Sequence, residues 1–191
     1  MSNPTINKTK EIKDNYSNIT EIGRRRDSIN QNTTQNPTLY LSIGLILVDL
    51  IKENTTKSSF KEKLRLQKNN IFTSHGVPNI TLSKYLERMK KYMKLEDNSI
   101  ILGLIYLDRF CRKTKIILTD YNTHRLLFIS ILTAVKYQED KFYTNKLYAQ
   151  VCGVKTTVLN QMEYEFVIGM GFEFYVSVSL FDKYKNTIST E

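Results

Sequence analysis

A ten-residue apolar run from Leu126 to Val135 constrains the fold more than any other feature of the sequence. Only Ser130 and Thr133 interrupt it, and both side chains are small enough to donate to a carbonyl oxygen one turn earlier. A helix that is apolar around its whole circumference must be buried on every side. Ten residues are too few to cross a bilayer, which takes about 20, so the burial must come from protein. The sequence therefore predicts a central helix within Asn122–Asp140, surrounded by other helices.

The composition is that of one intracellular domain with a polar extension. The chain has 191 residues, and a hydrophobic fraction of 41% is enough for one core of ordinary size. Cys111 and Cys152 both lie in apolar helical patterns, so we expect reduced thiols and no disulfide. The N-terminus has no apolar segment of the kind that directs secretion. We expect a protein of the nucleus or the cytoplasm that does not bind membranes.

The net charge of +9 raises the alternative of nucleic-acid binding. The charge is uneven, because residues 1–90 hold 15 basic and 8 acidic side chains, whereas residues 91–191 hold 13 and 11. We therefore do not expect the folded part to bind nucleic acid. The alternative is a domain that binds nucleic acid or transcription factors through its basic N-terminal half. In that half, Arg24–Ser28 is a candidate phosphorylation site at Ser28, a nuclear-localisation element or a solvated linker.

Helical periodicity and turn signals divide the chain into three parts. Residues 1–37 are polar with scattered isoleucines, which predicts a disordered N-terminal extension. Residues 38–178 form the domain, and residues 179–191 form a short C-terminal tail in which Leu180–Tyr184 makes a turn or short helix. No strand pattern or hairpin turn is present, so we predict an all-α fold. The expected helices are Pro37–Lys52, Ile80–Leu95, Asp97–Arg112, Asn122–Asp140, Asn145–Val151 and Thr156–Met170. Thr81 or Ser83 is expected to cap the helix Ile80–Leu95, and Asn122 or Thr123 the helix Asn122–Asp140. Gly153 and Gly171 are expected to end the last two helices.

Catalytic motifs are absent from the sequence. The two histidines, His75 and His124, stand in a Gly-Pro turn and at a helix start, so no metal-ligating spacing exists. No phosphate-binding glycine loop and no nucleophile motif occur either. Paired carboxylates such as Glu139 and Asp140 lie at a helix end, where solvation or capping explains them. We therefore expect a binding protein rather than an enzyme, with no metal, cofactor or small-molecule substrate.

Several short segments, in order along the chain, together resemble the cyclin box. Tyr106–Phe110 is similar to the YxDRF run that closes the second box helix, and Ala134–Asp140 is similar to the end of the third. Leu159–Glu163, followed by Gly171–Phe174, resembles the end of the box. The resemblance covers about residues 38–178. Within cyclins, the small single-box group of P/U type, the phosphate-pathway cyclins, is the most similar through Ile80–Arg88, Asn122–Leu126 and Asn145–Val154.

The resemblance implies a five-helix cyclin box with an additional N-terminal helix. It also implies a regulatory subunit that binds and activates a cyclin-dependent serine/threonine kinase as a heterodimer. In the family, a lysine that ends the third box helix and a glutamate of the fifth bond to the backbone around the kinase C-helix. Those positions match Lys136 and Glu163. The neighbouring apolar contacts carry over to Tyr137, Phe172 and Phe174, and strand-like alternation places the two phenylalanines on one face.

The resemblance further implies an internal ionic cluster of Arg88, Asp108 and Lys136. A charged group at the end of an apolar helix is costly unless it is paired, which agrees with this implication. A domain that keeps the cyclin fold without a kinase partner is a third alternative. The presence of both Lys136 and Glu163 argues against it.

Two departures from the family pattern limit what can be carried over. The helix that holds an apolar substrate-docking groove in cell-cycle cyclins reads Glu87–Lys94 here, with lysines at key apolar positions, and the chain has no tryptophan. We therefore do not expect that groove. No convincing second box follows Tyr184, which agrees with the single-box group.

Overall fold

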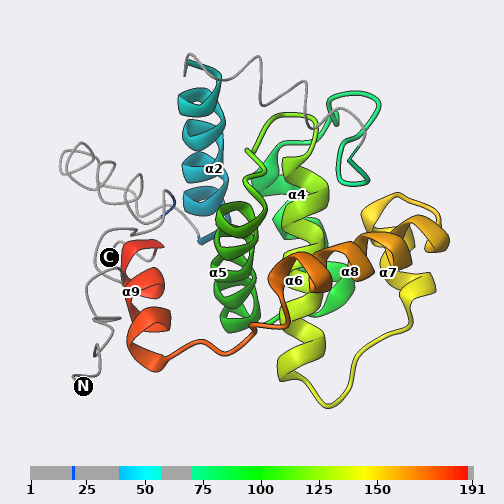
Figure 1. Ribbon diagram of the computed structural model, residues 1–191. Helices are drawn as coiled ribbons and strands as arrows, with labels where there is room; N and C mark the ends of the chain where they lie inside the picture. The colour runs from blue at the N-terminus through cyan, green and yellow to red at the C-terminus, as the bar shows by residue number, and fades with distance from the viewer. Residues whose placement is uncertain (1–18, 20–38, 57–69, 189–191) are drawn as a thin grey trace, which may run out of the picture.

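The predicted all-α fold is confirmed over the part of the chain that the computed structural model describes, which is residue 19 with residues 39–56 and 70–188. Within these ranges the regular structure consists of seven helices and no strand (Figure 1). In chain order the helices are α2 (Leu39–Thr56), α4 (Leu82–Met93), α5 (Asp97–Thr114), α6 (Thr123–Gln138), α7 (Asn145–Cys152), α8 (Thr156–Met170) and α9 (Val178–Ile188).

Helix α6 is the central helix that its sequence predicted. Every residue from Leu126 to Val135 is buried, and α4, α5 and α8 all pack against the helix (Figure 1). The hydroxyl of Ser130 donates to Leu127 O at 2.9 Å and that of Thr133 to Ile129 O at 2.8 Å, so neither polar group is unpaired in the core. No helix in the described residues, α6 included, is long and apolar enough to span a membrane.

A glycine allows α5 and α6 to approach closely. A Cβ atom on Gly103 would lie 2.5 Å from Ile131 Cγ1 and 2.8 Å from Ile131 Cα. The second atom belongs to the backbone of α6, so a larger residue at this position would push the two helices apart. The close packing of α5 against α6 therefore depends on glycine at position 103.

The helix ends follow the expected signals, with one variation. Thr81 caps α4 by accepting from Lys84 N at 3.3 Å, and Gly153 and Gly171 end α7 and α8 with φ angles of 78° and 61°. Asn122 occupies the N-cap position of α6 but makes no cap bond. Its side-chain amide binds the preceding loop instead. The amide oxygen accepts from Thr119 N at 2.8 Å, and the amide nitrogen donates to Ile117 O at 2.9 Å.

The prediction of a short tail over residues 179–191 is wrong as far as Ile188. Residues Val178–Ile188 form helix α9, which packs against α5 and α2. Its buried side chains are Tyr184, Thr187 and Ile188. The sequence predicted only a turn or short helix at Leu180–Tyr184, because few apolar residues mark the inner face of α9 and packing against α5 supplies the rest of its stability.

One residue of the N-terminal extension belongs to the core. Ile19 is only 2% exposed and joins the same apolar cluster as α2 and α5. At this residue, the assignment of residues 1–37 to an extension outside the core is wrong. The other residues of the extension, the candidate phosphosite Ser28 among them, lie outside the described part of the chain.

Candidate protein-binding surface

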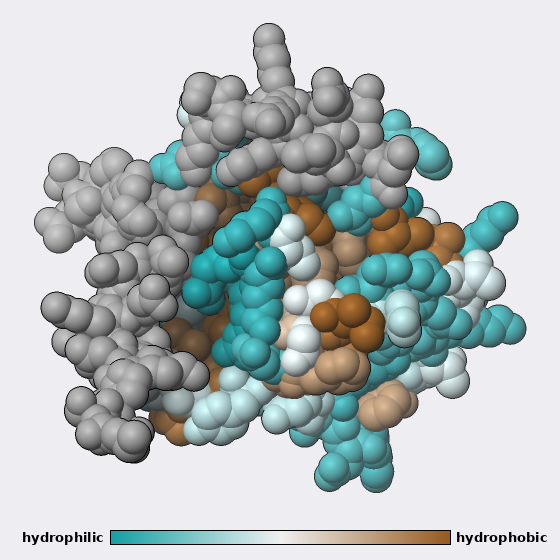
Figure 2. All heavy atoms as spheres, in the orientation of Figure 1, coloured by the Kyte–Doolittle hydropathy of each residue, from teal (hydrophilic) through white to brown (hydrophobic). Residues whose placement is uncertain are grey.

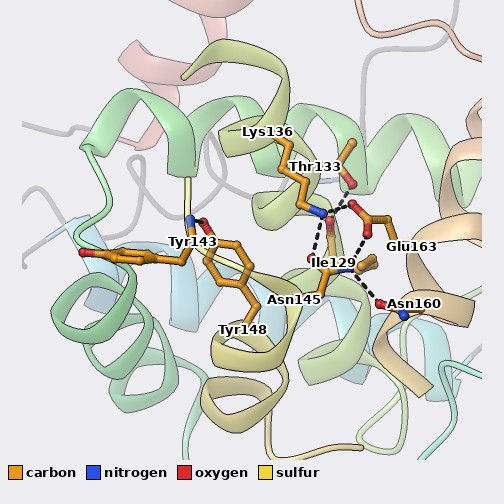
Figure 3. Close-up of polar contacts among 8 residues, drawn as sticks. All are labelled: Ile129, Thr133, Lys136, Tyr143, Asn145, Tyr148, Asn160 and Glu163. Carbon is orange, nitrogen blue, oxygen red and sulfur yellow. Dashed lines mark hydrogen bonds and ion pairs between the residues drawn. The ribbon is translucent and has the colours of Figure 1, made fainter. Parts of the chain in front are cut away.

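Lys136 and Glu163 meet where three helices converge. Lys136 lies in the last turn of α6, Glu163 on α8, and Asn145 is the first residue of α7. Lys136 Nζ donates to Glu163 Oε1 at 2.5 Å and to Asn145 Oδ1 at 2.7 Å (Figure 3). Asn145 Nδ2 in turn donates to Glu163 Oε2 and to Asn160 Oδ1, both at 2.8 Å. The structure thus brings together the two charged residues that the sequence singled out, and adds an asparagine that joins them.

The Lys136–Glu163 pair is shielded from solvent but not closed off. The two side chains keep 21% and 22% of their surface exposed. The ammonium group has three donors and uses two on these partners, and the carboxylate can accept more than the two bonds it has. Phe142 covers part of the ammonium, with its ring centre 5.8 Å from Nζ. A partner that reaches this edge would therefore find a free donor and a free acceptor side by side.

Large apolar side chains are exposed near this pair. Figure 2 shows hydrophobic side chains gathered near the middle of one face of the molecule, over α8, with hydrophilic side chains on either side. The exposed residues of α8 include Tyr164 and Ile168, and Phe172 is exposed two residues beyond the end of the helix. Tyr137, next to Lys136 on α6, is also exposed. Exposed aromatic residues beside a charged pair are the usual composition of a protein-interaction site.

The two predicted phenylalanine contacts differ in their surroundings. Phe172 is 68% exposed, whereas Phe174 is half-buried and packs against the Tyr106 and Tyr137 rings at centroid distances of 5.6 Å and 5.8 Å. The alternation that placed both on one face is broken because Gly171 and Phe172 both have a left-handed conformation, with φ of 61° and 58°. Phe172 is therefore fully available to a partner, and Phe174 only in part.

Three side chains of α5 hold the backbone from the last residue of α8 into the segment that leads to α9. We call Tyr106, Arg109 and Lys113 the α5 clamp, and residues 171–177 the connector. The bonds of the clamp run from Tyr106 Oη to Phe174 O at 2.7 Å, from Arg109 to Glu173 O and Tyr175 O, and from Lys113 Nζ to Met170 O at 2.9 Å. Sequence reasoning missed these roles, although the spacing of three and four residues places the side chains on one side of a helix.

The ionic cluster expected from Arg88, Asp108 and Lys136 does not form. Arg88 donates to Gln150 O at 3.4 Å, while Asp108 pairs with Arg112 at 3.2 Å and accepts from Tyr184 at 2.8 Å. Helices α5 and α6 are antiparallel, which explains the difference. Ser99, near the start of α5, bonds to Glu139, just after α6, at 3.1 Å. Asp108 is nine residues further along α5, about 14 Å from the end of α6 that carries Lys136.

Burial of Asp108 predicts a pH dependence of stability. Desolvation raises the pKa of this carboxyl above its ordinary value of 3.8, although Arg112 and Tyr184 oppose the shift. The folded chain then holds this proton more tightly than the unfolded chain does. The contribution of Asp108 to the free energy of unfolding is therefore complete below pH 3.8 and is lost as the pH rises through the folded-state pKa.

The variant Asp108→Asn tests this pH dependence, because it keeps an acceptor for Tyr184 and removes the titration. We expect its free energy of unfolding, relative to the native chain, to improve between pH 4 and pH 7, as measured by urea unfolding at each pH. Parallel curves for the two proteins would show that Asp108 does not titrate differently in the folded state.

The described residues offer little for metal or thiol chemistry. They contain no group of three or more histidine, cysteine or acidic side chains that could hold a metal ion. Both cysteines are free, and burial raises the pKa of the Cys152 thiol to about 11. Burial also raises the pKa of Cys111. Neither thiol is prepared for reaction at neutral pH.

Comparison with known proteins relates this arrangement to one family. The family model described as Cyclin matches residues 13–174. Cyclin-U4-1 of Arabidopsis thaliana is 31% identical over 160 residues, which cover 82% of this chain and 79% of the relative. Cyclin-U2-1 of the same plant is 40% identical over 120 residues, 61% of this chain and 53% of the relative. Cyclin-P3-1 of Oryza sativa subsp. japonica is 29% identical over 161 residues, 81% and 64% of the two chains. The chain thus matches about half of Cyclin-U2-1 and a larger share of the other two.

Proposed function

The chain belongs to the cyclin family and resembles its U and P types, and from this we propose that it is a regulatory subunit that binds and activates a cyclin-dependent serine/threonine kinase. Cyclins are regulatory proteins rather than enzymes, so the activity that depends on this chain belongs to its partner. We place the complex inside the cell, in the nucleus or the cytoplasm.

The Lys136–Glu163 pair is the observation that carries the proposal. Binding the backbone around a helix of the kinase needs a donor for carbonyl oxygens and an acceptor for amide groups. This pair offers both within one hydrogen-bonded group, held in place by Asn145. Tyr137 directly follows Lys136 and is exposed, and Phe172 is exposed just beyond the end of α8; both would exclude water from the contact. Charge-assisted hydrogen bonds are stronger when the surroundings are dry.

Activation would follow from the position of the bound kinase helix. A kinase transfers phosphate only when a glutamate of its C-helix pairs with the lysine that holds the ATP phosphates. A rigid surface that pushes this helix inward supports that pair. Helices α6 and α8, which carry Lys136 and Glu163, are fixed by the buried core and can bear such a contact.

Replacing Lys136 or Glu163 by alanine should weaken kinase binding by at least about 2 kcal/mol, the usual hot-spot threshold, or roughly 30-fold in affinity. Both side chains are partly exposed, so each variant should remain folded. The measurement is the affinity for a panel of recombinant cyclin-dependent kinases by titration calorimetry, with the kinase activity of each complex and a thermal melt of each variant.

Lys52→Ala is the matched control, because Lys52 is exposed on α2 and its ammonium group lies 3.9 Å from the Asp49 carboxylate. It should bind the kinase like the native chain. A folded Lys136→Ala, Glu163→Ala double variant that also binds normally would end the kinase-activator proposal. If the native chain binds no kinase but binds duplex DNA with a steep salt dependence, the nucleic-acid alternative takes its place.

A further inference from the structure

A pocket of about 300 Å³ opens beside Tyr137, the residue that follows Lys136 in α6. It is formed where α5, the end of α6, the connector and the start of α9 meet. Its lining residues are Asn98, Leu102, Tyr106, Tyr137, Gln138, Phe174, Tyr175, Val176, Val178 and Phe181.

The lining of this pocket is entirely uncharged, in a protein in which 25% of residues are charged. Aromatic and aliphatic side chains make up most of it, and Asn98 and Gln138 add two amide groups. An apolar side chain that entered would displace water without separating any ion pair. A charged side chain would lose its hydration and find no counter-charge. The pocket therefore suits a large apolar or aromatic group, and the amides can bind the backbone that carries it.

The wall that the connector contributes is held by backbone bonds. The α5 clamp binds the carbonyl oxygens of Glu173, Phe174 and Tyr175, so these bonds do not depend on the connector side chains. Tyr175 and Val178 nevertheless remain 78% and 77% exposed. Apolar side chains that are exposed on a fixed backbone lose little conformational freedom on binding, which favours association.

The pocket is continuous with the surface proposed for kinase binding. Tyr137 and Phe174 line the pocket and also belong to the predicted kinase contacts, with ring centres 5.8 Å apart. Tyr137 directly follows Lys136, so a kinase helix bound at the Lys136–Glu163 pair would lie beside a residue that lines the pocket. A third protein in the pocket would have to share Tyr137 with the kinase.

From this continuity we infer that the kinase subunit itself fills the pocket with an apolar or aromatic side chain from a segment outside its C-helix. The inference rests on the proposed function and deepens it. The kinase contact then has two parts, a polar one at the Lys136–Glu163 pair and an apolar one between Tyr137 and α9. The second part depends on α9 and on the last three residues of the connector, which lie beyond the end of the family-model match at residue 174.

The test is a charge placed in the pocket. Val178→Asp and Tyr175→Asp should each lower the affinity of the full chain for its recombinant kinase at least tenfold, as measured by titration calorimetry. Thermal melts should stay close to that of the native chain, because both side chains are exposed. Val77→Asp is the control, since Val77 is an exposed valine in the loop before α4, and its affinity should stay within twofold of the native value.

The outcomes separate this inference from the proposed function. If Lys136→Ala weakens binding and the two pocket variants do not, the kinase binds but leaves the pocket empty, and the inference is wrong. If the pocket variants bind the kinase normally but phosphorylate a protein substrate poorly, the occupant is the substrate, which also overturns the inference. If neither set of variants changes affinity, the proposed kinase contact itself fails.

Discussion

Replacing Phe110 by alanine is expected to lower the free energy of unfolding by about 3–5 kcal/mol. The Phe110 ring is buried, stacks on Phe166 with ring centres 4.5 Å apart, and meets the edge of Phe72 at 5.4 Å. It also fills the space above Gly169, where a Cβ atom would lie 2.4 Å from the ring. Rigid rings and helix backbone surround the site, so a cavity there cannot close easily. Urea unfolding followed by circular dichroism measures the loss.

Phe172→Ala is the matched control, because it removes the same side chain from an exposed position. Its stability should stay within about 0.5 kcal/mol of the native value. Its affinity for the kinase should fall instead, since Phe172 is part of the proposed contact. Equal losses of stability in the two variants would mean that Phe172 is packed in the core and that its exposure is misassigned.

Ending the chain after Ser177 is the second large change, and we expect it to cost roughly 3–6 kcal/mol of stability. The truncation removes α9, whose Tyr184 and Ile188 are buried, and each large buried side chain contributes about 1.5–3 kcal/mol. It also removes the hydroxyl that donates to the buried Asp108 carboxylate at 2.8 Å. The measurement is a thermal melt and a urea unfolding curve beside the full chain.

A point substitution separates the two parts of that loss. Tyr184→Phe keeps the ring and removes the hydroxyl bond to Asp108, so it should cost only about 1 kcal/mol. If the truncated chain were as stable as the full chain, α9 would not belong to the core. The tail predicted from the sequence would then be the correct description.

The fold could be predicted wherever the hydrophobic pattern was long and the end signals were clear. Helix α8 begins and ends where the pattern placed it, at Thr156 and Met170, because Gly171 supplies the left-handed residue that stops a helix. The apolar run of α6 could hardly be anything but a buried helix. At the candidate surface, Lys136 and Glu163 were found through their resemblance to a family pattern, and no spacing within this chain alone would have paired them.

The parts that could not be predicted depend on contacts between distant segments. Ile19 is an isolated apolar residue in a polar segment, and α9 has few apolar residues, so the sequence pattern does not predict that either lies in the core. They are buried only because α2 and α5 present a surface to them. The expected cluster around Asp108 failed for a related reason. Its partner Tyr184 lies on α9, 76 residues further along the chain, in a segment assigned to a tail. Side-chain bonds to backbone carbonyls, such as those of Arg109, leave no sequence signal at the accepting residue.

The α5 clamp has a consequence for how this surface can change. It grips carbonyl oxygens, which every amino acid has, and so the anchoring of the connector does not depend on the residues at Phe172 and Tyr175. Support and recognition are therefore encoded at separate positions. A protein engineer could exchange the exposed connector residues while leaving Tyr106 and Arg109 untouched, and redirect the same scaffold toward a different partner. Few substitutions would be needed, and stability would limit them little.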